Sequence, residues 1–292
     1  MFVSVVARKP DDPALLTYSG VTVMPGLSVY RGPAGDHNDH AMREVTGLGR
    51  ALASRLRVDA SSIGRPVPAD PVGWDVELER ARPHLSLMAD RIDQVLVEGL
   101  VPITAMTRCA VALATQPRVL AHHPEALVVW LDAHGDINVP GDTPTNYLGG
   151  MALSGPMGWW DSGLGSGLPA EQAILVGARD LDSAEVEHVR AGRVTLVDPG
   201  PNIGARVGEA VNERAVYLHV DCDVLEPGIV NTDYAAPGGL TLDDLHDCAL
   251  AVAAGTILGV EIAEYEGAAA AGPDELLDAL RPVLQSIVPD MR

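Results

Sequence analysis

The chain has 292 residues, of which 47% are hydrophobic, and its 40 acidic and 20 basic side chains give a formal net charge of −20 at pH 7. No apolar run approaches the ~20 residues that span a membrane, and so negative a chain repels nucleic acids and anionic membranes. We therefore expect a soluble protein whose partner is neither a nucleic acid nor a membrane. A cationic small molecule fits the sign of the charge, although surplus carboxylates that only maintain solubility explain the composition equally simply.

The N-terminus and the cysteines indicate a cytoplasmic protein. The opening stretch MFVSVVARKPDDP places its basic residues after a short apolar run, which is the reverse of a secretory signal. Cys109, Cys222 and Cys248 form an odd, sparse set that argues against a disulfide framework.

Apolar segments typical of β-strands alternate with amphipathic helical patterns along the chain. The expected strands lie at 101–106, 126–133, 173–178, 194–198, 215–223 and 257–264, and the clearest helical patterns span 78–99 and 274–288. The Pro- and Gly-rich stretches PVPADPVG, GSGLP and VDPGPNIG are typical of loops inside one domain, which we place at residues 1–292. This alternation predicts βαβ units and an α/β fold with a parallel sheet.

Acidic side chains follow two of the expected strands at the edge where α/β sheets bind ligands. Asp132, His134 and Asp136 alternate after ALVVWL, so their side chains point the same way, and Asp221 and Asp223 do so after AVYLHV. The pattern DxHxD alone also occurs in acidic loops with a solvated histidine. With DxD on a second strand, four carboxylates converge, and they would repel one another unless cations compensate them.

Two divalent ions would supply that compensation. Oxygen-rich ligation with one imidazole favours Mn²⁺ over structural zinc, which prefers Cys and His tetrahedra. Two ions ~3.5–4 Å apart share a bridging water and generate hydroxide near neutral pH, so a metal-bridging hydroxide is the expected nucleophile.

Three motifs resemble the ureohydrolase family, which includes arginase and agmatinase. LDAHGDIN, HVDCDVLEP and GVEIAE occur in the family's order and spacing, from about Val101 onward, whereas no family signature is recognisable before Val101. The resemblance implies a three-layer α/β/α sandwich with a central, mainly parallel sheet, and two Mn²⁺ ions that serve hydrolysis of a guanidinium group.

The resemblance also implies a role for each matched residue. Asp132 and Asp221 would bridge the ions, Asp136 would complete one of them, and His134 with Asp223 the other. The residues implied for an amino-acid substrate are Asn138 for the α-carboxylate, Asp182 and Glu185 for the α-ammonium, and Glu261 for the guanidinium.

The chain departs from the family at two positions. Cys109, in MTRCA, stands where the first metal-binding histidine is expected; a thiolate is a competent ligand, and the alternative is a small buried hydrophobe beside a weakened metal position. Gly149 and Gly150 precede Met151 where the family has His-Gly-Met, so the proton-shuttle histidine is missing and another group must protonate the leaving amine.

Two residues are candidates for that proton transfer. His219 lies on the same face of its strand as Asp221 and Asp223, so it could act as a base. The competing interpretation is that it only supports a metal ligand through a hydrogen bond. Glu264, three residues after Glu261, is the other candidate. The competing interpretation is that Glu264 is a solvated loop residue without a role in proton transfer.

We assign no metal-binding or catalytic role to the following Cys and His residues. Cys222 and Cys248 fit core packing. Four further histidines lack ligand spacing and are expected in surface or loop positions: His37, His40, His122 and His123.

Three functions remain open. An ordinary arginase needs the missing shuttle, whereas Nω-hydroxy-L-arginine has a less basic guanidine and an added oxygen. The Cys109 and Gly149 substitutions together resemble the hydroxyarginine-cleaving branch of the family in D-cycloserine antibiotic biosynthesis, which implies L-ornithine and hydroxyurea as products. The third is a non-catalytic family relic that binds an amino acid or a protein. Only PDMR follows the last helical pattern, too short a tail to wrap a neighbour, so we expect a monomer.

Overall fold

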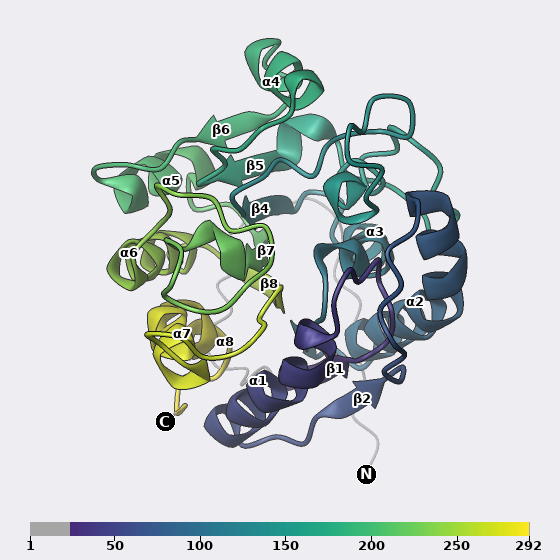
Figure 1. Ribbon diagram of the computed structural model, residues 1–292. Coiled ribbons are helices and arrows are strands. Elements are labelled where there is room, and N and C mark those ends of the chain that lie inside the picture. Colours follow the sequence, from purple (N-terminus) through teal and green to yellow (C-terminus); the bar gives the residue numbers. More distant parts are fainter. Residues whose placement is uncertain (1–23, 292) are drawn as a thin grey trace, which may run out of the picture.

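Eight parallel strands form one sheet in the computed structural model, which describes residues 24–291. The segment used above to argue against a secretory signal lies outside these residues. The sheet order is β2-β1-β3-β8-β7-β4-β5-β6 (Figure 1). The strands are β1 (Pro25–Tyr30), β2 (Ser61–Ile63), β3 (Val101–Ala105), β4 (Leu127–Leu131), β5 (Ala173–Val176), β6 (Thr195–Val197), β7 (Val216–Asp221) and β8 (Ile257–Ala263).

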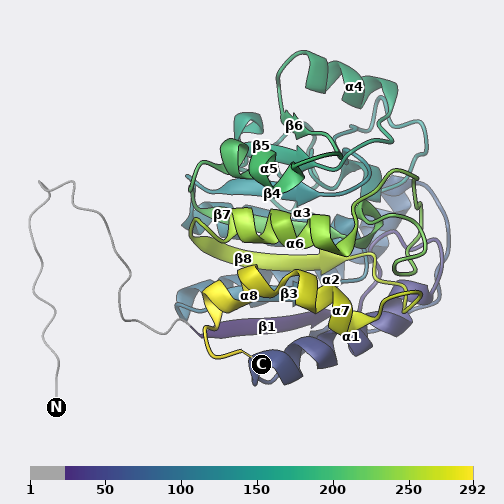
Figure 2. The ribbon, with the colours of Figure 1, turned by 90° about the vertical axis from the view of Figure 1, so that its left-hand side faces the viewer.

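Helices cover both faces of the sheet. One face carries α1 (His40–Leu56), α5 (Ile203–Val211), α6 (Leu242–Val252), α7 (Pro273–Ala279) and α8 (Arg281–Ile287), which lie together in front of the strands in Figure 2. The other face carries α2 (Trp74–Val97) and α3 (Ala112–His122), and α4 (Ser183–Arg190) lies near the β6 edge. The predicted three-layer α/β/α sandwich is therefore confirmed.

Strand alternation divides the buried side chains between two cores. On β4, Leu127 and Val129 pack in the core beneath α1 and α6, whereas Val128 and Trp130 pack in the core beneath α2 and α3. Cys222 and Cys248 lie in the first of these cores, as predicted.

All six predicted strands are present, and two strands were missed. β1 and β2 were overlooked because β1 begins with Pro-Gly and β2 has only three residues, so neither shows a clear period. The helical pattern at 274–288 is two helices, because Pro282 lacks an amide hydrogen and ends the pattern at Leu280. Among the described residues, no helix is long and apolar enough to cross a membrane.

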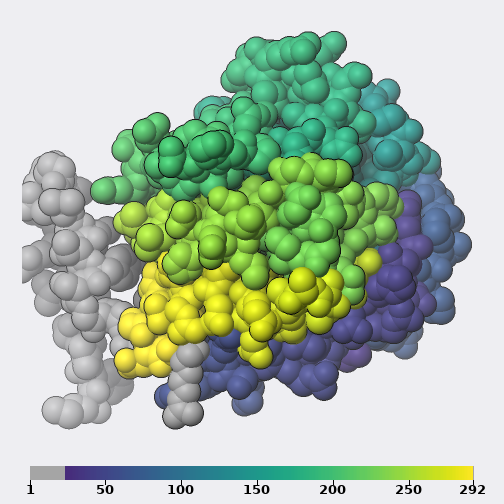
Figure 3. Space-filling view, turned by 60° about the vertical axis from the view of Figure 1, so that its left-hand side comes forward, coloured from purple at the N-terminus to yellow at the C-terminus, as the bar shows by residue number. Residues whose placement is uncertain are grey.

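The last strand lies in the middle of the sheet. β8 inserts between β3 and β7, and in the space-filling view the yellow C-terminal segment separates the purple N-terminal part from the green central part (Figure 3). In this arrangement Glu261 of β8 pairs in register with Thr104 of β3 and His219 of β7. The carboxyl ends of β3, β8, β7 and β4 therefore lie side by side, and every predicted metal ligand lies at the end of β7 or after β3, β4 or β7.

Candidate metal centre and substrate cavity

Asp132, His134 and Asp223 form one group at the ends of β4 and β7. His134 Nδ1 lies 3.0 Å from Asp223 Oδ2 and 3.3 Å from Asp132 Oδ1. One potential ligand atom from each of the three residues falls within 4.8 Å of the others. The two motifs, 90 residues apart, thus meet as the strand pattern predicts.

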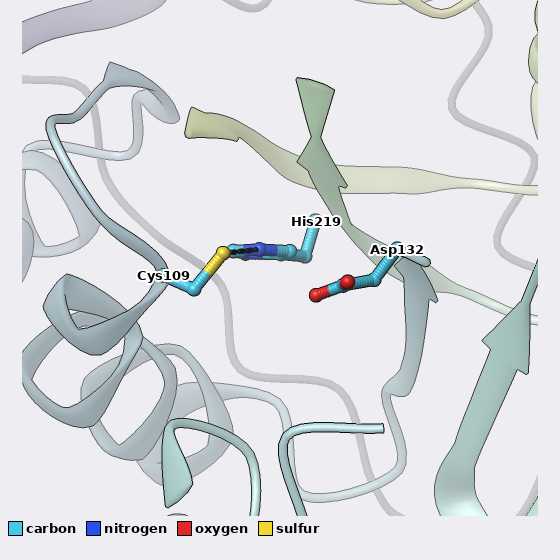
Figure 4. A group of neighbouring side chains, drawn as sticks. All are labelled: Cys109, Asp132 and His219. Carbon is cyan, nitrogen blue, oxygen red and sulfur yellow. Dashed lines mark hydrogen bonds between the residues drawn. The ribbon is translucent and has the colours of Figure 1, made fainter. Parts of the chain in front are cut away.

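Cys109 and Asp221 form the second half of the centre. Cys109 opens the 3-10 helix η1 (Cys109–Val111) after β3, and its thiol donates to Asp221 Oδ2 at 2.8 Å. Its Sγ also shares a group of potential ligand atoms with Asp132 and His219, and another with Asp221 and Glu264. Figure 4 shows the Cys109 thiol and the His219 ring meeting, with the Asp132 carboxylate approaching from the neighbouring strand. The structure therefore brings Cys109 to the position predicted for a ligand.

His219 and Trp130 support these residues from beneath. His219 is fully buried, with Nε2 3.1 Å from Cys109 Sγ, and its ring stacks on Trp130 at a centroid distance of 3.4 Å. Trp130 Nε1 donates to Asp132 Oδ2 at 2.8 Å. His219 thus has the geometry of the supporting interpretation, because both of its ring nitrogens are engaged by protein side chains.

Glu261 does not lie where the sequence interpretation placed it. Its side chain is fully buried within β8, and its oxygens contact four side chains: Thr115 Oγ1 at 2.6 Å, Gln116 Nε2 at 3.3 Å, Tyr217 Oη at 2.8 Å and His219 Nδ1 at 2.8 Å. Contact with a substrate guanidinium is inconsistent with this position. Glu261 is two residues short of the strand end, so it anchors His219 below the sheet edge.

Glu264 lies at that edge instead. It follows β8 with a φ of 60°, in the left-handed region, and is 4% exposed. Its carboxylate accepts from the Cys109 backbone amide at 3.2 Å and pairs with the fully buried Arg108, which also pairs with Asp36 at 3.1 Å and Glu266 at 2.9 Å. Glu264 is therefore an ordered part of the site, and not a solvated loop residue.

The electrostatics of the centre fit divalent cations. Burial, followed by repulsion from neighbouring carboxylates, raises the pKa of Asp136 and of Asp221 well above the ordinary carboxyl value, and raises that of Asp223 to about 6. Burial opposes charge on His134, but hydrogen bonds with Asp132 and Asp223 outweigh it and raise the pKa of His134 to about 12. Hard cations would relieve the repulsion, and the donors are carboxylates, one imidazole and one thiol, so the residues fit a two-metal site.

A cavity of about 670 Å³ opens beside the centre. His134 and Asp136 line it, and so do the predicted substrate-binding residues Asn138, Asp182 and Glu185. Asp136 adopts a φ of 52°, and its carboxylate is not part of the three tight ligand groups found in the described part of the chain.

The far wall of the cavity is built around Asp182 at the start of α4. Asn138 Nδ2 donates to Asp182 Oδ2 at 2.8 Å. Glu185 accepts from the Asp182 and Ile137 amides at 2.9 and 3.1 Å, so it caps the helix and also holds the loop after β4. Burial raises the pKa of Glu185 to about 7. These acidic groups favour a cationic ligand at this wall.

His37 lies in the loop before α1, as expected, but it also belongs to the cavity. Its side chain lines the cavity, with Nε2 2.9 Å from Glu77 Oε1 and Nδ1 2.7 Å from Tyr234 Oη. The sequence carried no signal for this cluster, because its members are far apart along the chain and follow no shared spacing.

Comparison with known proteins agrees with the motifs. A profile described as "Arginase family" matches residues 52–275, so the likeness begins well before Val101. The Nω-hydroxy-L-arginine amidinohydrolase of Streptomyces lavendulae is 36% identical over 263 residues, which are 90% of this chain and 96% of that protein.

Two solved structures share the fold. Arginase from Bacillus caldovelox superimposes with a TM-score of 0.71 at 23% identity, covering 92% of this chain and 99% of that one. Arginase from Entamoeba histolytica gives a TM-score of 0.75 at 18% identity, covering 90% and 99%.

Proposed function

Since this chain belongs to the arginase family, we propose that it is an amidinohydrolase whose substrate is Nω-hydroxy-L-arginine and whose products are L-ornithine and hydroxyurea. The observation that carries the proposal is the meeting of Cys109, Asp132 and Asp221 beside an acidic cavity that lacks the shuttle histidine at Gly149. The relative from Streptomyces lavendulae, which matches most of both chains and is named for action on this substrate, supports Nω-hydroxy-L-arginine over arginine as the substrate.

The metal ions belong to the proposal. Two Mn²⁺ ions would be held by these residues: Cys109, Asp132, His134, Asp136, Asp221 and Asp223. When bound, they supply an activated water at neutral pH and balance the charge of the carboxylates.

The chain's own residues orient the substrate and handle protons. The acidic wall formed by Asp182 and Glu185 attracts the α-ammonium group, with Asn138 placing the amino-acid end. We assign the guanidine contact to Glu264, because it lies beyond the end of β8 at the sheet edge with Cys109, whereas Glu261 is buried within the strand.

Glu264 is also suited to give up a proton. In the metal-free chain, burial outweighs the opposing charge of Arg108 and raises the pKa of Glu264 to about 8, so this carboxyl can hold a proton near neutral pH. Hydrolysis adds one water across the bond between the guanidine carbon and Nδ of ornithine. The oxygen and one hydrogen go to hydroxyurea, and the other hydrogen goes to the departing amine, for which Glu264 would be the proton donor.

The test is a steady-state comparison of substrates with manganese-loaded protein. We expect the kcat/KM for Nω-hydroxy-L-arginine to exceed that for L-arginine and for agmatine, with ornithine and hydroxyurea formed in equal amounts by mass spectrometry. Asp132→Ala serves as the inactive control. Preference for arginine would identify an arginase, and about two bound ions without turnover of any guanidine would contradict the enzymatic proposal. Absence of bound metal would favour the family relic.

A further inference from the structure

Tyr147 occupies the space beside Gly149 where the shuttle histidine is missing. A Cβ built on Gly149 would lie 2.3 Å from Tyr147 Cε1 and 2.9 Å from Tyr147 Oη. Real side chains do not approach so closely, so any residue larger than glycine at position 149 would displace the phenol ring. The Tyr147 ring can therefore occupy this position only because residue 149 is a glycine and not the histidine of the family.

The Tyr147 hydroxyl is a buried polar group without a partner. Its oxygen is shielded from solvent, and no described residue offers it a hydrogen bond. Burial, followed by the charge of Glu264, raises the pKa of Tyr147 well above its ordinary value, so the phenol remains protonated and able to donate. A buried hydroxyl without a hydrogen-bond partner is destabilising, and the residue also lines the cavity, so a ligand atom is the natural partner.

The wall around Tyr147 holds the ring in place. The centroid of the Tyr147 ring lies 4.6 Å from that of the His37 ring and 5.3 Å from that of the Tyr234 ring. Glu77 ties the wall together, because one of its oxygens contacts His37 Nε2 at 2.9 Å and the other accepts from the Leu148 amide at 3.0 Å. The Tyr234 hydroxyl, in contrast, is already bonded to His37, so Tyr147 offers the free donor.

We propose that the Tyr147 hydroxyl is a specificity-determining group that donates a hydrogen bond to the N-hydroxyl oxygen of the substrate. This inference rests on the proposed function. A site that hydrogen-bonds a substrate hydroxyl discriminates against the analogue that lacks it, because binding the analogue leaves a buried donor unpaired. Arginine has no oxygen at this position, so Tyr147 favours hydroxyarginine over arginine without any new charge in the site.

The decisive variant is Tyr147→Phe, which removes one oxygen and keeps the ring over Gly149. We expect kcat/KM for Nω-hydroxy-L-arginine to fall about 10- to 100-fold while that for L-arginine stays unchanged, so the preference collapses. A second readout is calorimetric binding to chelator-treated protein, where the dissociation constant for hydroxyarginine should rise about tenfold and that for arginine should not.

Tyr234→Phe is the matched control, because it removes a hydroxyl of the same wall whose partner is a protein side chain. We expect it to change the constants for both substrates by the same factor. Gly149→Ala should reproduce the Tyr147→Phe loss by pushing the ring aside. Wild-type preference for hydroxyarginine that survives in Tyr147→Phe would overturn this inference and leave the proposed function intact. A wild type that prefers arginine would refute the proposed function before any variant is made.

Discussion

For the metal-free protein, the free energy of unfolding should fall as the pH rises from about 4.5 to about 7. Burial, followed by the charge of Asp132, raises the pKa of Asp223 from 3.8 to about 6 in the folded chain. Between these two values the folded state keeps a proton that the unfolded chain has lost. The contribution to stability is therefore fully present below pH 3.8 and is lost as the pH rises towards 6.

The magnitude follows from the size of the shift. A rise of about two pKa units corresponds to about 3 kcal/mol, of which about 2 kcal/mol is lost between pH 4.5 and pH 7. Burial also raises the pKa of Glu185 to about 7, which acts in the same direction. Bound metal reverses the trend, because the carboxylates must be ionised to ligate and the ions stabilise only the folded state.

The assay is urea unfolding of chelator-treated protein, followed by tryptophan fluorescence across this pH range, with and without added Mn²⁺. Asp223→Asn is the matched control, because its amide oxygen can still accept from the Ala133 amide while the titrating proton is gone. The free energy of unfolding of the control should fall by about 2 kcal/mol less than that of the wild type. Equal losses in the two proteins would refute the reasoning about Asp223.

Four further outcomes are expected. Asp132→Ala or Asp221→Ala should abolish activity and metal content together, since each would remove a ligand shared by both ions; retained occupancy of both positions, measured by atomic emission, would contradict the bridging role. Cys109→Ser should weaken one metal position more than the other, because serine stays protonated, and unchanged metal titrations would reduce Cys109 to packing. Glu261→Ala should lower the free energy of unfolding by about 3 kcal/mol or more, because four buried partners lose their acceptor, and a normal urea midpoint with a raised KM would instead restore its substrate role. Sedimentation equilibrium should give a mass near 30.6 kDa, the value of a monomer, whereas a stable threefold multiple would contradict the expected monomer.

The sequence by itself determined the sheet and the two acidic strand ends. Six apolar runs in alternation with helical patterns predicted six of the eight parallel strands, and the period of two placed Asp132 with His134 and Asp221 with Asp223 on common faces. These features depend on local periodicity, and carboxyl ends of parallel strands necessarily meet at one edge. The convergence of His134 and Asp223 at one edge of the sheet therefore followed from the sequence, whereas their assignment to one ion came from the family resemblance.

The tertiary structure alone decided how deep each side chain lies and which distant groups meet it. Glu261 and Glu264 differ by three positions on one motif, yet the first is buried among Thr115 and Tyr217 and the second contacts Cys109 beyond the strand end. Periodicity reports the face of a strand, but not where the strand stops or which helix covers it. The same holds for the cavity wall, because His37 and Tyr147 become neighbours only when the loops before α1 and after β4 pack together.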